Sequence, residues 1–236
     1  MSLRYSRILL KLSGELFMSG TASVDTRAVD AVAEEIAGLA KKKISVGVVV
    51  GGGNIMRGRI VKGSRDDELA GHKAGMVATV INGIMLMRAL ERRGVKAQLF
   101  GAFKVGRFVA AEDTERMARA RRAGAVLLFV GGTGVPFKST DSAVVMRAVA
   151  VKADAIFKLT THVDGVYDKD PRRFPGAKKF RTISYGEALK KKLGVMDLEA
   201  FGEARQYQIP IHVMKWGKGR VLRVLKGEKI GSVVSG

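Results

Sequence analysis

The sequence contains no cysteine and only three histidines, which limits the chemistry open to it. Without cysteine, disulfides and thiolate metal sites are excluded. His72, His162 and His212 lack the spacing of metal ligands, so we expect no zinc centre and no dedicated metal site. Aromatic residues make up 6% of the chain and do not alternate regularly with basic residues. No platform for stacking nucleic-acid bases is therefore predicted.

Long hydrophobic runs are also lacking. The first residues form a charged turn followed by the short apolar run Ile8–Leu10, without the extended apolar core of a signal peptide. No apolar run reaches the length expected of a membrane-spanning segment. We therefore expect a cytoplasmic protein without membrane segments. With 236 residues, of which 47% are apolar, the chain is expected to form one large α/β domain.

Basic residues dominate the charge balance. The chain has 42 Lys and Arg against 22 Asp and Glu, a net charge of +20. Such a charge attracts polyanions, including nucleic acids and polyphosphate ligands. The densest basic stretch, Lys169 to Lys192, is typical of a solvated basic face. Nucleic-acid binding stays open as a secondary interaction.

Strand patterns alternate with helix patterns along the chain. Strands are predicted at Ile8–Leu10, Val46–Val50, Ala97–Phe100, Ala125–Val130, Ala155–Leu159 and Ile211–Met214. Helices are predicted after a cap at Asp25 and over Ala74–Arg92, Glu112–Arg122, Asp141–Val151, Ser184–Lys192 and Glu199–Tyr207. Ser184 and Glu187 have the spacing of a capping box. This alternation predicts an α/β fold with a mainly parallel sheet covered by helices.

Three unusual loops follow predicted strands. Lys11 closes the first strand and is followed by Ser13-Gly14. Gly51-Gly52-Gly53 follows the strand Val46–Val50, and Arg57 comes shortly after it. Gly131 to Pro136 follows a third strand and leads into Ser139-Thr140-Asp141. Such loops can direct backbone N–H groups at phosphate, and ligands of parallel sheets bind at the carboxyl ends of the strands.

None of these loops fits the two commonest nucleotide-binding motifs. No Gly-Lys-Ser or Gly-Lys-Thr completes a Walker A loop, and no Gly-x-Gly-x-x-Gly follows the first strand. A single glycine-rich loop is often only a tight turn. Three of them at one sheet indicate a phosphate-handling enzyme of neither class.

Six motifs resemble those of the bacterial UMP kinases, members of the amino-acid kinase superfamily. They are Arg7–Glu15 (RILLKLSGE), Gly51–Gly58 (GGGNIMRG), Gly75–Gly83 (GMVATVING), Gly132–Ser142 (GTGVPFKSTDS), Val163–Pro171 (VDGVYDKDP) and Val195–Asp197 (VMD). The match runs from about Arg7 to Val234 in nearly the order and spacing of the family. The resemblance implies a three-layer αβα sandwich, with residues 1–154 binding the acceptor and residues 155–236 binding ATP.

The resemblance also implies a role for particular residues. The catalytic residues would be Lys11, Arg57, Asp141 and Asp197. The ATP-binding residues would be Lys11, Leu12, Ser13, Gly14, Gly53, Arg57, Thr160 or Thr161, Tyr167 and Asp170. The acceptor-binding residues would be Gly52, His72, Thr133, Gly134, Val135, Pro136, Phe137, Lys138, Ser139 and Thr140. The threonine is left open because the chain has one extra residue before Val163.

The implied reaction is UMP + ATP to UDP + ADP, a step of pyrimidine nucleotide biosynthesis. Its cofactor would be Mg²⁺ bound with ATP, and its usual assembly a homohexamer built as a trimer of dimers. A nucleoside monophosphate is already nearly dianionic at neutral pH, so the reaction requires no strong base. It requires positive charge to bring two anionic phosphates together.

The acceptor side departs from the family pattern. His72 stands where the family has an aspartate that contacts the ribose of UMP, Val135 replaces an asparagine, and Lys138 replaces an aromatic residue. The loop Phe17–Val24 lacks the glycine spacing associated with GTP activation. Three hypotheses follow: UMP is the acceptor, these residues and Lys73 fit the pocket to another anionic acceptor, or the chain is a nucleic-acid-binding regulator on a kinase fold.

Overall fold

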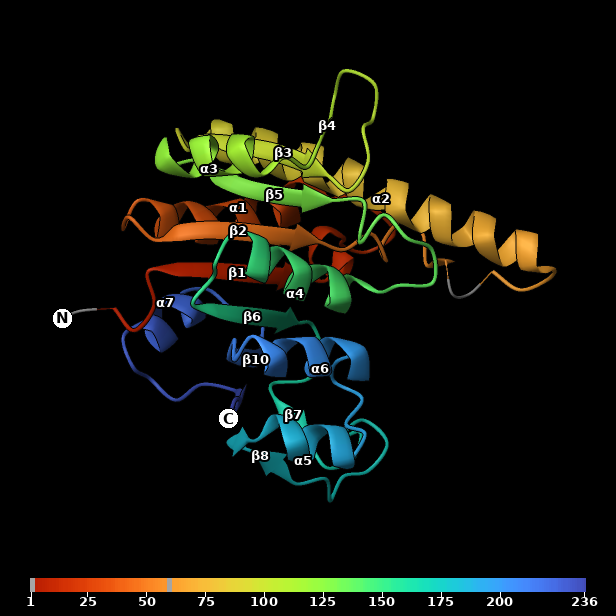
Figure 1. Cartoon of the computed structure of the whole chain (residues 1–236), viewed down its shortest axis with the longest axis vertical. Coiled ribbons are helices and arrows are strands. Elements are labelled where there is room, and N and C mark those ends of the chain that lie inside the picture. Colours follow the sequence, from red (N-terminus) through yellow and green to blue (C-terminus); the bar gives the residue numbers. More distant parts are fainter. Residues whose placement is uncertain (1–2, 59–60) are drawn as a thin grey trace.

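The computed structural model describes residues 3–58 and 61–236, in which a large sheet lies between helices on both faces (Figure 1). The sheet has nine strands in the order β4-β3-β5-β2-β1-β6-β10-β11-β9. Only β10 and β11 pair in antiparallel fashion. The strands are β1 (Arg7–Leu12), β2 (Ser45–Val50), β3 (Ala97–Gly101), β4 (Ala110–Ala111), β5 (Val126–Val130), β6 (Ala155–Thr160), β9 (Thr182–Ile183), β10 (Ile211–Lys215) and β11 (Ser232–Val234). A separate antiparallel pair is formed by β7 (Val166–Tyr167) and β8 (Lys179–Phe180). The predicted αβα sandwich is confirmed.

Seven α-helices cover the sheet in the described part of the chain. They are α1 (Thr26–Ala40), α2 (Arg65–Glu91), α3 (Thr114–Arg122), α4 (Thr140–Ala150), α5 (Tyr185–Lys190), α6 (Leu198–Gln206) and α7 (Arg220–Leu225). A short 3₁₀ helix, η1 (Gly14–Phe17), follows β1. The predicted caps are present: the Asp25 carboxylate accepts from the Arg27 N–H at 2.7 Å, and the Ser184 hydroxyl accepts from the Glu187 N–H at 3.1 Å.

Successive side chains of the central strands enter two different cores. Ile8, Leu10 and Leu12 of β1 pack beneath α1, α2 and α7. Leu9 packs on the other face, beneath α3, α4, α5 and α6. Because side chains alternate along a strand, Lys11 projects toward the same face as Leu9, which α4 covers. The sheet therefore directs a lysine at the start of α4.

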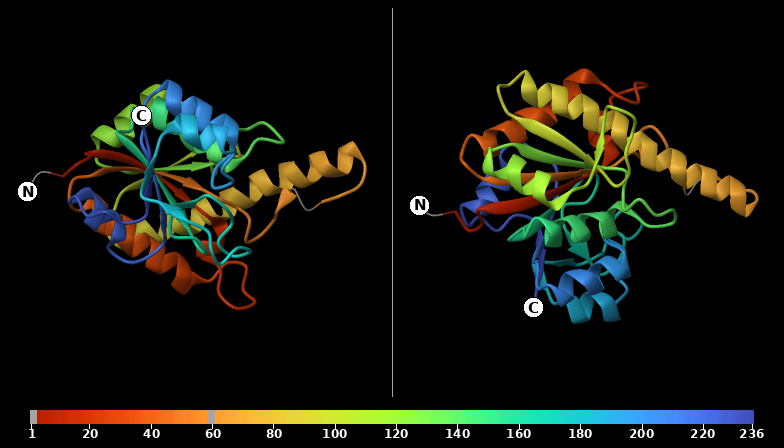
Figure 2. Two further views of the ribbon diagram at one scale, coloured as in Figure 1. Left: turned by 90° about the horizontal axis from the view of Figure 1, so that it is seen from below. Right: turned by 45° about the horizontal axis from the view of Figure 1, so that its top comes forward.

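Helix α2 differs from its prediction. The pattern predicts Ala74–Arg92, but the helix begins nine residues earlier, at Arg65, because Ser64 and Asp67 form a reciprocal capping box. Its N-terminal half extends away from the sheet (Figure 2). By length and composition α2 could cross a membrane, which corrects the expectation that no segment qualifies. This is weak evidence, because core helices pass the same test and 44% of its most apolar window is buried.

All seven α-helices of the described residues end in one recurring turn, in which a left-handed residue is followed by an N–H that donates to the carbonyl five residues back. After α7 the left-handed residue is Gly227 (φ 100°). At the ends of α2 and α3 the left-handed residues are glycines, Gly94 (φ 70°) and Gly124 (φ 74°). After α1 and α4 they are lysines, Lys43 (φ 61°) and Lys152 (φ 54°). Lys192 and Gln208 occupy the same position after α5 and α6. A side chain in this conformation costs roughly 1–2 kcal/mol, which glycine avoids.

Lys43→Gly is expected to stabilise the protein, because it removes the backbone strain of the left-handed turn. A net gain of about 1 kcal/mol corresponds to a rise in Tm of roughly 2–4 °C for a chain of this size. Gln208→Gly is the matched change without loss of charge, and Gly94→Ala should shift Tm in the opposite direction. Calorimetry at one pH measures all three. A lower Tm for both Lys43→Gly and Gln208→Gly would contradict this prediction. It would show that contacts of the lysine and glutamine side chains stabilise the protein by more than the left-handed backbone costs.

Candidate active site

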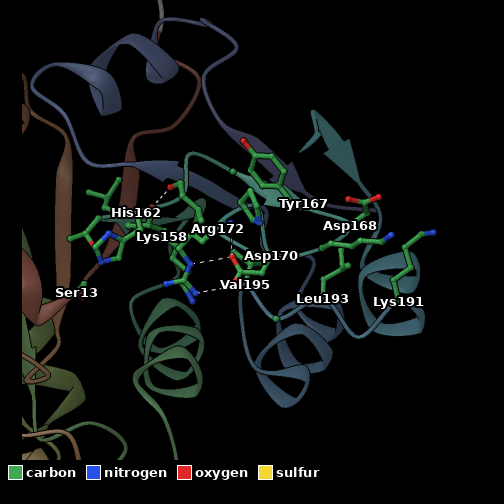
Figure 3. Close-up of a pocket in the computed structure, with 18 of the residues that line it drawn as sticks. Ser13, Lys158, His162, Tyr167, Asp168, Asp170, Arg172, Lys191, Leu193 and Val195 are labelled. Atoms are coloured by element: carbon green, nitrogen blue, oxygen red, sulfur yellow. Dashed lines mark hydrogen bonds and ion pairs between the residues drawn. The ribbon is translucent and has the colours of Figure 1, made fainter. Parts of the chain in front are cut away.

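Two cavities open at the carboxyl ends of the parallel strands. The C-terminal cavity has a volume of about 500 Å³ and is lined mainly by residues 158–172 and 191–195 (Figure 3). The N-terminal cavity has a volume of about 620 Å³ and is lined by residues between 11 and 142, together with Asp197 and Glu199. Both volumes are in the range of small-molecule sites. Lys11 and Ser13 line both cavities, so the two meet at the end of β1.

Two lysines converge on one carboxylate where the cavities meet. Lys11 of β1 and Lys158 of β6 are register partners on neighbouring strands. The Lys158 ammonium donates to both oxygens of Asp141, at 2.9 and 2.7 Å, and the Lys11 Nζ lies 3.2 Å from Oδ1. Asp141 stands in the first turn of α4, after the cap Ser139. Strand pairing and the start of one helix thus bring these three charges together.

The three charges depend on one another. Burial opposes ionisation of Asp141, but Lys158 and Lys11 outweigh burial and lower the pKa of this carboxyl to about 2. Burial lowers the pKa of Lys158 to about 8, although Asp141 acts in the opposite direction. Asp141 is 8% exposed and Lys158 is 9% exposed. At neutral pH two ammonium groups therefore share one carboxylate, which leaves positive charge available to an anionic ligand.

The glycine loop after β2 packs tightly between η1 and α2. A Cβ on Gly52 would lie 2.9 Å from the Ala78 Cβ and from backbone atoms of α2. A Cβ on Gly53 would meet only the flexible Arg57 side chain, at 3.6 Å. Asn82 of α2 holds the loop by donating to the Gly51 carbonyl at 2.7 Å. Gly52 is thus needed for close packing, whereas Gly53 is not.

Gly52→Ala is therefore expected to separate the loop from α2 and to destabilise the protein. An overpacked core position typically costs about 1–3 kcal/mol, whereas Gly53→Ala should leave stability within about 0.5 kcal/mol. Urea unfolding of both variants measures the difference. Equal free energies of unfolding for the two variants would contradict the close approach of Gly52 to α2.

Glu15 connects the two cavities. One of its carboxylate oxygens accepts from the Arg57 guanidinium, which lines the N-terminal cavity. The other accepts from the Thr161 hydroxyl at 2.5 Å and lies 3.3 Å from Nε2 of His162, in the loop that lines the C-terminal cavity. The Thr161 hydrogen bond, together with Arg57 and His162, holds the pKa of Glu15 below its usual value. Arg57 therefore already has an anionic partner.

The loop after β5 is tied to α6. The Ser139 hydroxyl donates to the Asp197 carboxylate at the start of α6, and Lys138 forms an ion pair with Glu199. Phe137, in the left-handed conformation (φ 64°), places its ring 4.4 Å from the ring of His72 of α2. Both rings line the N-terminal cavity.

The structure distributes the predicted site residues between these cavities. The N-terminal cavity is lined by the predicted residues Gly14, Gly52, Gly53, Arg57, His72, Val135, Pro136, Phe137, Lys138, Ser139, Thr140, Asp141 and Asp197. The C-terminal cavity is lined by Thr160, Thr161, Tyr167 and Asp170. Leu12 is buried in the core, and Leu12, Thr133 and Gly134 line neither cavity. Gly14, Gly53 and Arg57, which the resemblance implies bind ATP, line the N-terminal cavity.

Sequence reasoning missed Lys158 and Glu15. Lys158 interrupts the apolar run Ala155–Leu159. A buried strand rarely holds a charge without a partner, so this position could have indicated a buried ion pair. Glu15 stands beside the predicted residues Ser13 and Gly14, but its partners Arg57 and Thr161 are distant in the sequence. Lys73, proposed to reshape the acceptor pocket, is exposed and lies outside the cavity lining.

Acidic side chains are few at the junction of the cavities. Within residues 3–58 and 61–236 no group of three or more His, Asp or Glu is arranged to hold a metal ion. Both oxygens of Asp141 accept from Lys158, so this carboxylate is already engaged. A divalent cation fits this site only when phosphate groups provide most of its ligands.

Comparison with known proteins identifies the family. Residues 6–215 match the amino acid kinase family. The uridylate kinase of Alcanivorax borkumensis is 41% identical over 233 residues, covering 98% of this chain and 92% of that protein. The UMP kinase of Bacillus anthracis superposes with a TM-score of 0.92 at 30% identity, covering 98% of this chain and 96% of the other. The UMP kinase of Ureaplasma parvum gives a TM-score of 0.89 at 33% identity, covering 99% and 100%. The chain therefore belongs to the amino acid kinase family and, within it, to the uridylate kinases.

Proposed function

We propose that the protein is a UMP kinase, which transfers the γ-phosphoryl group of ATP to UMP and forms UDP and ADP for pyrimidine nucleotide biosynthesis. The observation that carries this proposal is the convergence of Lys11 and Lys158 on Asp141 where two nucleotide-sized cavities meet. The relatives named uridylate kinase support the identity of the acceptor.

In this proposal each cavity takes one nucleotide. The C-terminal cavity, lined mainly by residues beyond 155, takes ATP, with Tyr167 and Asp170 near the nucleoside. The N-terminal cavity, lined mainly by residues before 154, takes UMP. Residues 1–154 and 155–236 are then the acceptor and ATP parts of one amino-acid kinase unit. Lys11 and Ser13 line both cavities and so meet the group in transit.

The chemistry requires charge compensation more than proton transfer. A phosphate oxygen of UMP forms a bond to the γ-phosphorus, and the bond from that phosphorus to the β–γ bridging oxygen breaks, leaving ADP. Because the UMP phosphate is already nearly dianionic, no base has to remove a proton. Lys11 and Lys158 would stabilise the charge on the transferring group, Arg57 would hold the acceptor phosphate, and Asp141 would position both lysines.

Magnesium enters this proposal as part of the substrate. Mg²⁺ usually binds through phosphates and only one or two carboxylates. Since Asp141 is engaged by Lys158, we expect the ion to arrive with ATP and to be held mainly by its phosphates and water. Activity should therefore be lost in excess EDTA and restored by excess Mg²⁺.

The direct test is a panel of nucleoside monophosphates with Mg-ATP, scored by ADP release. We expect UMP to be phosphorylated with the highest kcat/KM. Efficient turnover of another acceptor with none of UMP would overturn the proposal, and absence of turnover with every acceptor would favour a binding protein. His72→Asp in the same panel tests the acceptor side, because a carboxylate accepts from two hydroxyls but a neutral imidazole from only one.

Lys11→Met is expected to lower kcat by about a hundredfold or more while the protein stays folded. The reason is that Lys11 faces both cavities, and one lost stabilising group at a transferring centre costs on this order. Steady-state kinetics and circular dichroism measure the two effects. Near-normal kcat in a folded variant would exclude Lys11 from the transfer step.

Lys158 should impose an alkaline limit on activity. The pKa of Lys158 is lowered to about 8, so its ammonium is present below pH 8 and is lost above it. We expect kcat/KM for ATP to fall about tenfold per pH unit above pH 8. Bound phosphates favour the ammonium, so the fall in kcat should come at a higher pH. Lys158→Arg, whose charge persists, should lack this decline; the same decline in both proteins would assign it to another group.

Assembly and location complete the proposal. We propose a cytoplasmic homohexamer built as a trimer of dimers. Supporting it, Val77, Ile81 and Ile84 form an exposed apolar stripe along one face of α2, with exposures of 49%, 45% and 36%. Such an apolar stripe on one face of α2 is the surface expected to pack against another copy.

A further inference from the structure

The amino ends of the central strands form a strongly basic surface on the side of the sheet opposite the two cavities. Strands β3, β5 and β2 are neighbours, and their parallel pairing places their first residues at one edge. In Figure 1 this edge lies on the left, away from the strand arrowheads. Each of these strands is preceded by a basic segment: residues 92–96 before β3, 119–122 before β5 and 41–43 before β2. Lys152 precedes β6, which is separated from β2 by β1. We call the basic residues of these segments, with Lys152, the basic edge.

The basic edge concentrates the charge of the protein. Every residue from 41 to 43 is a lysine, segment 92–96 holds two arginines and a lysine, and segment 119–122 holds three arginines. No acidic residue occurs in these segments, so the basic edge contributes half of the net charge of +20. Arg92 and Arg93 share Asp30, and Arg119 approaches Glu115. Within residues 3–58 and 61–236, the other seven form no salt bridge and are therefore available to an external anion.

The end of a helix explains only part of this charge. Basic side chains in a last turn are favoured by the helix dipole. However, Lys43, Lys96 and Lys152 lie beyond the helices they follow. Lys43 and Lys152 also occupy left-handed positions that α2 and α3 fill with glycine. The chain thus keeps positive charge at two positions where the backbone favours a residue without a side chain.

We propose that the basic edge binds the phosphodiester backbone of nucleic acid without reading its sequence. A row of exposed lysines and arginines along several strand ends matches a repeated phosphate charge better than a single small anion. The segments contain no aromatic side chain to stack on bases, so the contacts are with phosphates. They also contain none of the large exposed hydrophobic residues that a membrane surface would engage. The cavities lie at the opposite ends of the strands, so binding leaves them open to nucleotides.

The left-handed lysines provide a test in which affinity and stability move in opposite directions. The probe is a fluorescein-labelled duplex of arbitrary sequence, roughly 30 base pairs long, followed by anisotropy from about 50 to 200 mM salt. Wild-type protein should bind it, and saturating Mg-ATP with UMP should not displace it. The double variant Lys43→Gly/Lys152→Gly should weaken binding on the order of tenfold. Each lost phosphate contact lowers the slope of log K against log salt by about 0.9, so two lost contacts should lower it by about 2. The same variant should unfold at a higher temperature.

Gln208→Gly is the matched control, because it relieves the same turn without removing charge. It should raise Tm and leave the affinity and the salt slope unchanged. Lys41→Gln/Lys42→Gln is the second charge variant, placed outside left-handed positions, and should weaken binding by a similar factor even if the glycine variants fold poorly. Kinase turnover should be unchanged in all of them.

Four results would overturn the proposal. They are absence of duplex binding by the wild type, displacement of the duplex by Mg-ATP and UMP, an unchanged salt slope in both charge variants, and binding to phosphatidylglycerol vesicles but not to the duplex. Displacement by nucleotides would assign the interaction to the cavities, and vesicle binding would assign it to a membrane surface. Kinase turnover is measured separately from duplex binding. A failure of the proposed kinase activity can therefore be distinguished from a failure of the proposed nucleic-acid binding.

Discussion

Asp141 favours the charged form of Lys158 at a place where burial alone would favour loss of that charge. Lys158 is nearly inaccessible, and its neighbour across the strands, Lys11, carries the same charge. Without the carboxylate between them, the end of the sheet would hold two like charges in a medium of low polarity. The arrangement requires β1 and β6 to be adjacent, to be in register, and to end beneath the first turn of α4. The order of the strands and the start of one helix are thus constrained by a single ion cluster.

The loops beside this cluster contain glycine where the backbone is closely packed. The loops after β1 and β2 pass close to each other, since a Cβ on Gly51 would lie 2.9 Å from the Gly14 nitrogen. Gly14 and Gly52 allow this: a Cβ on Gly14 would lie 2.7 Å from the Gly53 nitrogen, and Gly52 approaches α2 equally closely. Ion pairs then connect the parts of the chain, through Lys138 with Glu199 and Glu15 with Arg57.

The sequence predicted those features that depend on local pattern. Six strands (β1, β2, β3, β5, β6 and β10), the Asp25 cap, and the position of Lys11 at a strand end follow from periodicity and glycine placement, whereas the short strands β4, β7, β8, β9 and β11 were not predicted. The role of Lys158 could not be read in the same way, because its partner Asp141 is 17 residues away and meets it only through the fold. The start of α2 was missed because the polar residues after Ser64 hide the helix. Arg57 and Gly53 line the N-terminal cavity, and the sequence could not place them there because the path of their loop depends on tertiary packing.

The ion pair between Glu15 and Arg57 has a consequence for selectivity. The Arg57 guanidinium has a carboxylate partner, so an incoming phosphate exchanges one anion for another instead of filling an uncompensated site. The free energy for that exchange must come from the remainder of the ligand, its sugar and base. Inorganic phosphate and other small anions have no such remainder. The Glu15 carboxylate thus disfavours binding of abundant small anions at Arg57, while a nucleotide of the right shape is still admitted.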